Sequence, residues 1–321
     1  MHIIILLSSI GAMSQGKDST AISAGAVITE KFPATRIFDV QYQQLGKANY
    51  KSKVFGEDAE KTQVKNHSRL KVTANLPIYQ SKSRRFFITN TLRYKFEAYD
   101  YGTTYSIPSQ TYLSRPNQQY HYFAGSLSGT YFSSLFKKPV LYNATVTVDG
   151  NQKDVQRVKG FVSATAVLRK NEHTTMTVGV VALVDPSSII PFSPTFSYEH
   201  RFKDLPWKLD IILPQRVLLT RSLLENGRIS IGTELNNENY YLTINDTGFN
   251  GVYEFNQLEL RNGITYEYIF LKNCIATFRG GITNVITARI TERGAKTSKY
   301  VAENKQDAQP FFLLGLSYNP F

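Results

Sequence analysis

Strict alternation of apolar and polar residues is the feature of this sequence that most limits what it can fold into. Between Arg69 and Ile78, apolar residues occupy every second position, and the residues between them are polar or charged up to Asn75. Successive side chains of a β-strand point to opposite faces, so the segment predicts a strand with one apolar and one polar face. The same pattern recurs along the chain, most plainly at 85–98, 157–169, 174–184 and 255–270.

We call the apolar residues at every second position of a segment its apolar phase. The length of these apolar phases indicates a membrane-spanning sheet. No uninterrupted apolar run reaches the roughly 18 residues of a membrane helix, so insertion into a bilayer would have to use strands. Each alternating segment is about as long as the strand of roughly 9 to 11 residues that crosses an outer membrane. A soluble β-sandwich would alternate in the same way, so periodicity alone does not distinguish the two.

Connection lengths favour the membrane barrel over the sandwich. Outer-membrane barrels have tight periplasmic turns and longer external loops, an asymmetry that a sandwich has no reason to keep. We expect tight turns at 81–84, 137–139, 170–172, 203–206 and 271–273. The long external loops are expected at 46–66, 99–118 and 285–307.

The sequence therefore predicts an all-β fold, an antiparallel up-and-down transmembrane β-barrel of about 14 strands, with 12 as the alternative. An even number places both termini on the periplasmic side. The stretch 206–254 is the hardest to divide, because Tyr240 to Leu242 could be a separate strand or part of an external hairpin. The expected strands are 36–45, 68–79, 85–98, 119–134, 140–149, 157–169, 174–184, 192–203, 207–214, 216–223, 228–236, 255–270, 273–285 and 308–319.

The amino-terminal segment predicts export. Met1 to Leu7 is apolar, and the small residues Ala12 and Ser14 precede a plausible cleavage point, so residues 1–14 are expected to be a signal peptide. No Lys or Arg precedes the apolar run, which leaves the true start codon open. Residues 15–35 are expected to be a periplasmic leader or a plug in the lumen, and residues 36–321 the transmembrane barrel.

The charge limits the classes of partner that we expect, and the cysteine content limits covalent modification. The net charge is +12, from 37 Lys plus Arg against 25 Asp plus Glu, but the basic residues are scattered, so we expect no nucleic-acid partner. Outer-membrane lipid and lipopolysaccharide are the expected partners, and the oligomeric state stays open. With Cys274 as its only cysteine, the chain has no internal disulfide or lipidated amino-terminal cysteine.

The carboxy-terminal segment predicts both compartment and assembly route. An apolar phase runs through the last expected strand, and the chain stops at an aromatic residue, which is typical of substrates of the barrel-assembly machinery. The expected localisation is therefore the outer membrane. The assembly signal consists of Phe312, Leu314, Leu316, Tyr318 and Phe321.

If the apolar phases face lipid, the opposite phases place mixed charges in the lumen. We predict a pore or binding channel for small polar solutes, because rings of charged side chains set selectivity in channels. The alternative is a non-conducting barrel with a structural or partner-docking role, whose charges only pair with one another. The lumen-facing candidates are Lys71, Arg93, Lys95, Glu97, Glu259, Arg261, Glu267 and Arg279.

Catalysis is a weaker interpretation. A lipid-modifying barrel enzyme would need a nucleophile, a base and an orienting group together, whereas His67, His121, His173 and His200 are dispersed and no G-x-S-x-G motif occurs. No two histidines have metal-ligand spacing, and the cysteine is isolated. We therefore expect no enzymatic activity, no metal and no cofactor.

One segment also carries a family resemblance. With Trp207 to Pro214, then Arg216, Gly232 and the strand Gln257 to Phe270, the chain resembles an uncharacterised family of outer-membrane β-barrel proteins of Bacteroidota-type bacteria. The resemblance implies the same fold and compartment. It implies no activity.

Overall fold

The structure is a computed structural model, and it describes residue 32 and residues 35–114, 116–246 and 249–320. It is built from strands alone. Among the residues described, no helix is long and apolar enough to cross a membrane. The expected signal peptide, most of the expected leader, and Phe321 lie outside the described residues.

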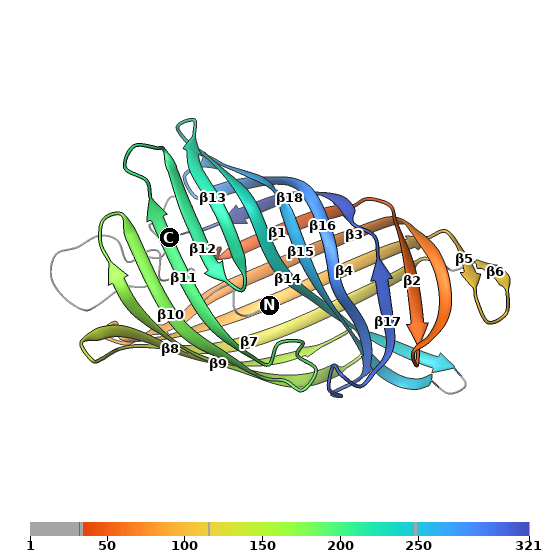
Figure 1. The fold of residues 1–321 in the computed structure, drawn as a ribbon. Helices are drawn as coiled ribbons and strands as arrows, with labels where there is room; N and C mark the ends of the chain where they lie inside the picture. The colour runs from red at the N-terminus through yellow and green to blue at the C-terminus, as the bar shows by residue number, and fades with distance from the viewer. Residues whose placement is uncertain (1–31, 33–34, 115, 247–248, 321) are drawn as a thin grey trace.

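A single antiparallel sheet curls into a closed barrel of 14 wall strands, as the alternation predicts (Figure 1). Neighbouring strands follow in chain order, and the barrel closes where the first strand pairs with the last, with Phe38 opposite Tyr318 and Leu45 opposite Phe311. The first seven wall positions hold β1 (Phe38–Leu45), β3 (Glu57–Gln80), β4 (Phe86–Tyr101), β7 (Gln118–Leu135), β8 (Lys138–Gly150), β9 (Val155–Lys170) and β10 (Thr174–Val184). The other seven hold β11 (Phe192–Arg201), β12 (Trp207–Leu213), β13 (Arg216–Leu223), β14 (Gly227–Asp246), β15 (Phe249–Leu271), β16 (Cys274–Glu292) and β18 (Gln309–Tyr318).

Four further strands lie at one end of the barrel. β2 (Ala48–Val54) continues β1 along β3, and β17 (Tyr300–Gln306) continues β18 along β16, while β2 and β17 pair with each other. β5 (Thr103–Ser106) and β6 (Thr111–Ser114) form a small hairpin. We call this the mouth end. The opposite end, with the tight turns and the start of β1 and end of β18, is the turn end (Figure 1).

The tight turns are where the sequence predicts them, but the long external loops are not loops. Residues 46–66 form β2 and the first part of β3, 99–118 hold the end of β4 with β5 and β6, and 285–307 hold the end of β16 with β17. Beyond the lipid a strand needs no apolar face, so its backbone can stay paired while the alternation disappears. Tyr240 to Leu242 lies within the long β14–β15 hairpin rather than forming a separate strand.

The outward face carries the apolar phase. Leu92, Leu127 and Ile264 are each about half exposed, and apolar side chains form a band around the wall that suits a hydrocarbon solvent. Exposed aromatic residues gather near the turn end, which resembles the girdle at one interface of an outer-membrane barrel. They are Phe38, Tyr79, Phe86, Tyr131, Tyr142, Tyr268, Phe270 and Tyr318.

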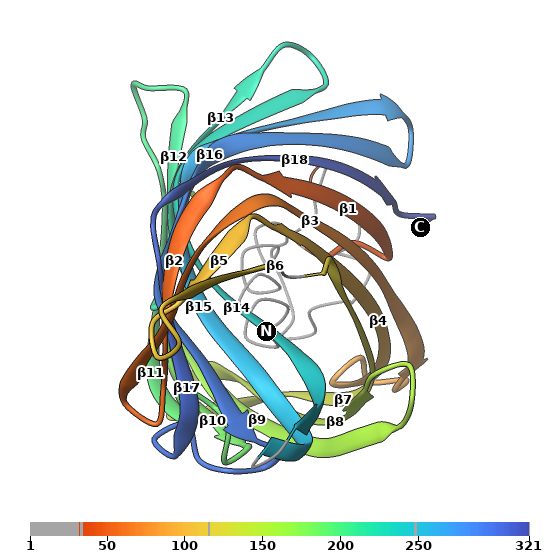
Figure 2. The same ribbon diagram turned by 90° about the vertical axis from the view of Figure 1, so that its right-hand side faces the viewer.

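The outer part of the β14–β15 hairpin bends into the barrel, while β15 stays paired with β16 as far as Tyr253 opposite Glu292. Residues 253–257 are buried in succession, so both faces of β15 are covered there, whereas a strand in the wall exposes one face to lipid. β13 ends its pairing with β14 at Arg216 opposite Glu234, so the hairpin has no neighbour on that side beyond this point. Figure 2 shows β14 and β15 crossing inside the ring of strands towards β7 and β8.

A row of glycines lies where the hairpin turns inward. Gly232 is opposite Gly263 on β15, and Gly263 is opposite Gly281 on β16. A Cβ atom on Gly232 would lie 2.0 Å from the carbonyl oxygen of Val217, and one on Gly281 would lie 2.0 Å from that of Asn262. Side chains at these positions would therefore prevent the close backbone approach that the bend requires.

Candidate functional site: a charged lumen divided by the β14–β15 hairpin

The lumen-facing phases of β3 and β4 bring like charges together. In the register of this pair, Lys71 is opposite Lys95, and Arg69 is opposite Glu97. Like charges directly across a strand pair destabilise a sheet unless a counter-charge is present. Glu238 of the infolded hairpin supplies it, because its carboxylate forms ion pairs with the ammonium groups of both lysines.

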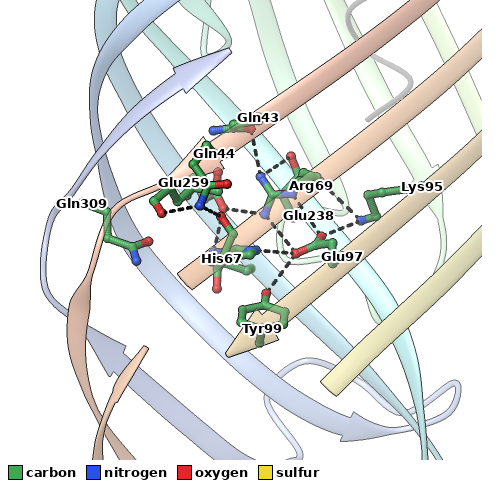
Figure 3. Close-up of polar contacts among 12 residues, drawn as sticks. Gln43, Gln44, His67, Arg69, Lys95, Glu97, Tyr99, Glu238, Glu259 and Gln309 are labelled. Atoms are coloured by element: carbon green, nitrogen blue, oxygen red, sulfur yellow. Dashed lines mark hydrogen bonds and ion pairs between the residues drawn. The ribbon is translucent and has the colours of Figure 1, made fainter. Parts of the chain in front are cut away.

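Arg69 is the centre of the resulting network, which Figure 3 shows in close-up. Its side chain is 1% exposed, and its guanidinium is 3.1 Å from Glu97, 3.3 Å from Glu238 and 3.2 Å from Glu259. These carboxylates come from β4, β14 and β15, so one buried cation joins the wall to both strands of the hairpin. Planar guanidinium suits such multiple contacts better than a lysine would.

Neighbouring side chains add hydrogen bonds to these carboxylates. His67 Nε2 is 3.0 Å from Glu97 Oε2, and the Tyr99 hydroxyl donates to the same oxygen at 2.9 Å. Arg261 donates to Glu259 through Nε and Nη2, at 2.9 and 2.6 Å. Buried charges are tolerated only when paired in this way, so the network holds the hairpin firmly against β3 and β4.

The other face of the hairpin is tied to the opposite wall. Glu254, which is fully buried, accepts from Arg157 and Lys159 of β9, each at 2.8 Å. The Tyr241 hydroxyl donates to Asp149 of β8 at 2.6 Å. Two networks, one on each face, therefore fix the hairpin across the lumen.

The loop after β10 joins the second network. Asp185 lies 2.7 Å from Arg157 and 3.6 Å from Lys159. Burial favours the neutral carboxyl, but these two cations outweigh it, so the pKa of Asp185 lies below its ordinary value. The carboxylate is therefore charged at neutral pH and adds to the tie between wall and hairpin.

An aromatic layer lies beyond the charges on the mouth-end side. The ring of Tyr240 stacks on Tyr120 at a centroid distance of 4.3 Å and on Phe255 at 4.6 Å. Tyr50 and Tyr99 are buried in the same cluster. Packed aromatic rings exclude water, so this layer strengthens the ion pairs beneath it and closes the lumen further.

Two cavities remain on the turn-end side of these contacts. The larger, chamber 1, has a volume of about 380 Å³ and is lined by residues of β1, β3, β4, β10 to β16 and β18 together with Phe32. The smaller, chamber 2, has about 80 Å³ and lies between the hairpin and β3, β4, β7, β8, β9 and β10. Lys71, Thr73 and Arg93 line both chambers, so they mark the junction.

The lining of chamber 1 is polar and mostly ion-paired. Lys208 is 3.2 Å from Glu199, and Arg216 is 2.8 Å from Asp210. Other pairs are Arg279 with Glu234, and Arg36 and Arg228, which share Glu267. Such a surface is suited to water and polar groups rather than to an apolar molecule.

The structure places each charged residue that the sequence singles out on the lumen side. Lys71, Arg93, Arg261, Glu267 and Arg279 line chamber 1, while Lys95 lines chamber 2. Glu97 and Glu259 are buried in the Arg69 network. Whether any of them contacts a solute stays a prediction.

Residues of the expected assembly signal lie on the lipid-facing side of β18. Phe312, Leu314, Leu316 and Tyr318 are between 44% and 53% exposed. Their recognition by the barrel-assembly machinery stays a prediction.

Sequence reasoning missed the residues that divide the lumen. Arg69 is in the same polar phase as Lys71, so its position was available from the pattern. Glu238 and Glu254 gave no comparable signal, because they lie at 237–254, outside the expected strands. Arg157 begins an expected strand, but nothing in the pattern indicated its partner. Their role arises from the inward bend, which periodicity does not encode.

Within the described part of the chain, no three His, Cys, Asp or Glu side chains form a cluster that could hold a metal ion. His67, the most buried of the described histidines, is stacked on Tyr99 with 4.0 Å between ring centroids and contacts Glu97 through Nε2. This contact pairs one of its two ring nitrogens with a carboxylate.

No known protein-family model matches the sequence. A search of the curated proteins found no relative. The Bacteroidota-type resemblance therefore stays a prediction.

Solved structures that resemble the chain are outer-membrane β-barrels. An outer membrane channel from Pseudomonas putida F1 shares 10% identity over 94% of this chain and 99% of its own, with a TM-score of 0.39. A mutant of TodX, a monoaromatic hydrocarbon channel, shares 12% over 97% and 98%, also with a TM-score of 0.39. The outer membrane protease OmpT from Escherichia coli shares 9% over 88% and 96%, with a TM-score of 0.28. These likenesses concern barrel architecture and carry no argument about substrate.

Proposed function

We propose that this chain is an outer-membrane channel for small polar solutes that rests in a closed state, with the β14–β15 hairpin as the closing element. The observation that carries the proposal is a polar, charged chamber of about 380 Å³ that ends against the infolded hairpin. A volume of this size suits one small organic molecule. In this proposal the turn end and both termini face the periplasm, and the protein has no enzymatic activity.

The hairpin has the properties of a removable plug. It is attached by ion pairs and hydrogen bonds of Glu238, Glu254 and Glu259 and, along one edge, by the pairing of β15 with β16, whereas β13 no longer pairs with β14 there. Its base at Gly232 remains in the sheet. Displacing the part beyond the glycine row would therefore break its pairing with β16 and leave the turn-end part of β14 and β15 in the wall.

The alternative is a non-conducting barrel whose charges fill its interior. The two buried networks are the observation that favours it, since together they fill much of the cross-section towards the mouth end. The two functions differ in what happens after the hairpin is removed. A channel then conducts, whereas an interior built only for stability collapses or stays blocked.

The test is single-channel conductance of the refolded, detergent-purified protein in a planar bilayer. We would compare the wild type with Arg93→Ala and with a shortened variant in which Asn-Gly replaces residues 236–259. This joins Leu235 to Leu260, which are opposite each other, through a turn suited to a hairpin. The variant Glu238→Gln/Glu254→Gln keeps the full hairpin and guards against misfolding of the shortened one.

We expect rare, brief openings in the wild type, a steady conductance in the shortened variant, and more frequent openings in the double variant. Arg93→Ala should change the conductance, because Arg93 lies at the junction of the chambers. Silence from hairpin variants that are shown to be folded by their circular dichroism and gel mobility would overturn the channel and favour the structural barrel.

A further inference from the structure

We infer that the solute is an anion, a small molecule bearing a carboxylate or phosphate group, and that it binds at a basic strip formed by Lys71, Arg93 and Lys95. This inference rests on the proposed channel function and names its substrate class. The strip runs along neighbouring positions of β3 and β4, where Lys71 is opposite Lys95 and Thr73 is opposite Arg93. It lies at the junction of the two chambers.

The lining of both chambers favours negative solutes. Chamber 1 is lined by eight Arg or Lys side chains and five Asp or Glu side chains. Chamber 2 is lined by four Arg or Lys side chains, with Asp185 as the acidic one. A concave surface with an excess of one sign focuses its field and concentrates ions of the opposite sign.

Much of the counter-charge of the basic strip comes from the hairpin, and Glu97 of the wall adds a contact with Lys95 at 3.4 Å. Glu238 contacts Lys71 and Lys95, while Glu254 contacts Arg157 and Lys159 on the opposite wall. Without the hairpin, the wall groups of the two networks and Arg93 comprise six basic side chains against three acidic ones. The basic set is Arg69, Lys71, Arg93, Lys95, Arg157 and Lys159, and the acidic set is Glu97, Asp149 and Asp185.

The glutamates of the hairpin therefore occupy the places that a solute carboxylate or phosphate would take. An anion bound at the strip competes with Glu238 for the same ammonium groups. The chemistry that binds the solute is then also the chemistry that releases the plug, because each anion bound removes one attachment of the hairpin.

One amide of the hairpin in each chamber offers an uncompensated hydrogen-bonding group. Asn256 is 5% exposed and lines chamber 2, and its Nδ2 has no hydrogen-bond acceptor among the described residues. Nδ2 of Asn236, which lines chamber 1, is in the same situation. A buried N–H donor without an acceptor is costly, and a carboxylate or phosphate oxygen is a strong acceptor.

The experiment measures ion selectivity in a planar bilayer under a tenfold KCl gradient, with the shortened variant as the open background. We expect a reversal potential on the anion-selective side, with chloride favoured over potassium by roughly threefold or more. Adding Lys71→Gln/Arg93→Gln should move the potential most of the way to zero. Lys82→Gln, in the exposed turn between β3 and β4, is the matched control and should leave it unchanged.

A second measurement separates the two anion chemistries and does not need the shortened variant. Inorganic phosphate and succinate are added at millimolar concentration to Glu238→Gln/Glu254→Gln in chloride, and block of the chloride current is recorded. Block by either supports the strip and shows which oxygen group it prefers, provided that Lys71→Gln/Arg93→Gln weakens it several-fold.

The two hypotheses fail in different ways. A conducting barrel that is cation-selective, or whose selectivity and block ignore Lys71 and Arg93, overturns the anion inference and leaves the channel standing. No current from any folded hairpin variant overturns the channel itself.

Discussion

Replacing Arg69 by methionine should cost about 3 kcal/mol of the free energy of unfolding. Removing one partner of a buried ion pair typically costs roughly 3–5 kcal/mol, because the remaining charge is left uncompensated. Here Arg69 lies 3.1 to 3.3 Å from three carboxylates that are each 0–1% exposed. Methionine keeps much of the volume, so the loss reports mainly on charge.

The lower end of that range applies because each carboxylate keeps another partner. Glu97 retains Lys95 at 3.4 Å, Glu238 retains Lys95 at 3.3 Å, and Glu259 retains Arg261 at 2.6 Å. Adding Glu259→Gln to Arg69→Met should cost less than the two separate losses combined, with a coupling of about 1–3 kcal/mol.

Urea unfolding of the protein refolded in lipid vesicles, followed by gel mobility, measures these values. Lys82→Met in the exposed turn is the control and should stay within about 0.5 kcal/mol of the wild type. A loss below about 1 kcal/mol for Arg69→Met, with additive double variants, would show that the network does not stabilise the fold as argued.

Two further changes test the wall. Leu92→Arg, in the middle of the lipid-facing side of β4, should lower the free energy of unfolding by about 2–4 kcal/mol in the same assay. Val184→Arg, at the mouth end of β10, should lower it by only about 0–1 kcal/mol. Equal losses would contradict the lipid-facing assignment. Gly281→Ala should lower the free energy of unfolding by about 1–3 kcal/mol, because its Cβ would lie 2.0 Å from a backbone oxygen. Gly280→Ala should be tolerated, because its Cβ would lie 3.9 Å from the nearest atom. The reverse order would refute the role of the glycine row.

The membrane-spanning part of the fold is predictable because lipid imposes a simple rule on it. β4 shows this well: every second residue must be apolar, so the strand predicted at 85–98 is observed as Phe86–Tyr101. The same rule predicts the lumen-facing positions of Lys71, Arg93 and Lys95, since residues between the apolar ones must face the lumen. Towards the mouth end that constraint disappears, and the strands at 57–66 and 285–292 were interpreted as loops.

The division of the lumen was not predictable for a different reason. The contact between Lys95 and Glu238 joins residues 143 positions apart and exists only because the sheet bends inward at Gly232 and Gly263. Local pattern carries no information about such a contact. The sequence feature that could indicate an infolded hairpin is a long segment with tyrosines and glutamates on both faces. A strand in the wall would instead have one apolar face.

The way in which the plug is held bears on how it could be released. An apolar plug is held by the exclusion of water, which no small polar solute can replace. Glu238 and Glu254 instead hold the hairpin through groups that a solute carboxylate or phosphate could duplicate, and Lys71 is 16% exposed in its side chain. Each contact that a solute replaces lowers the free energy needed to move the hairpin, so a polar plug makes closure conditional on what occupies the chamber.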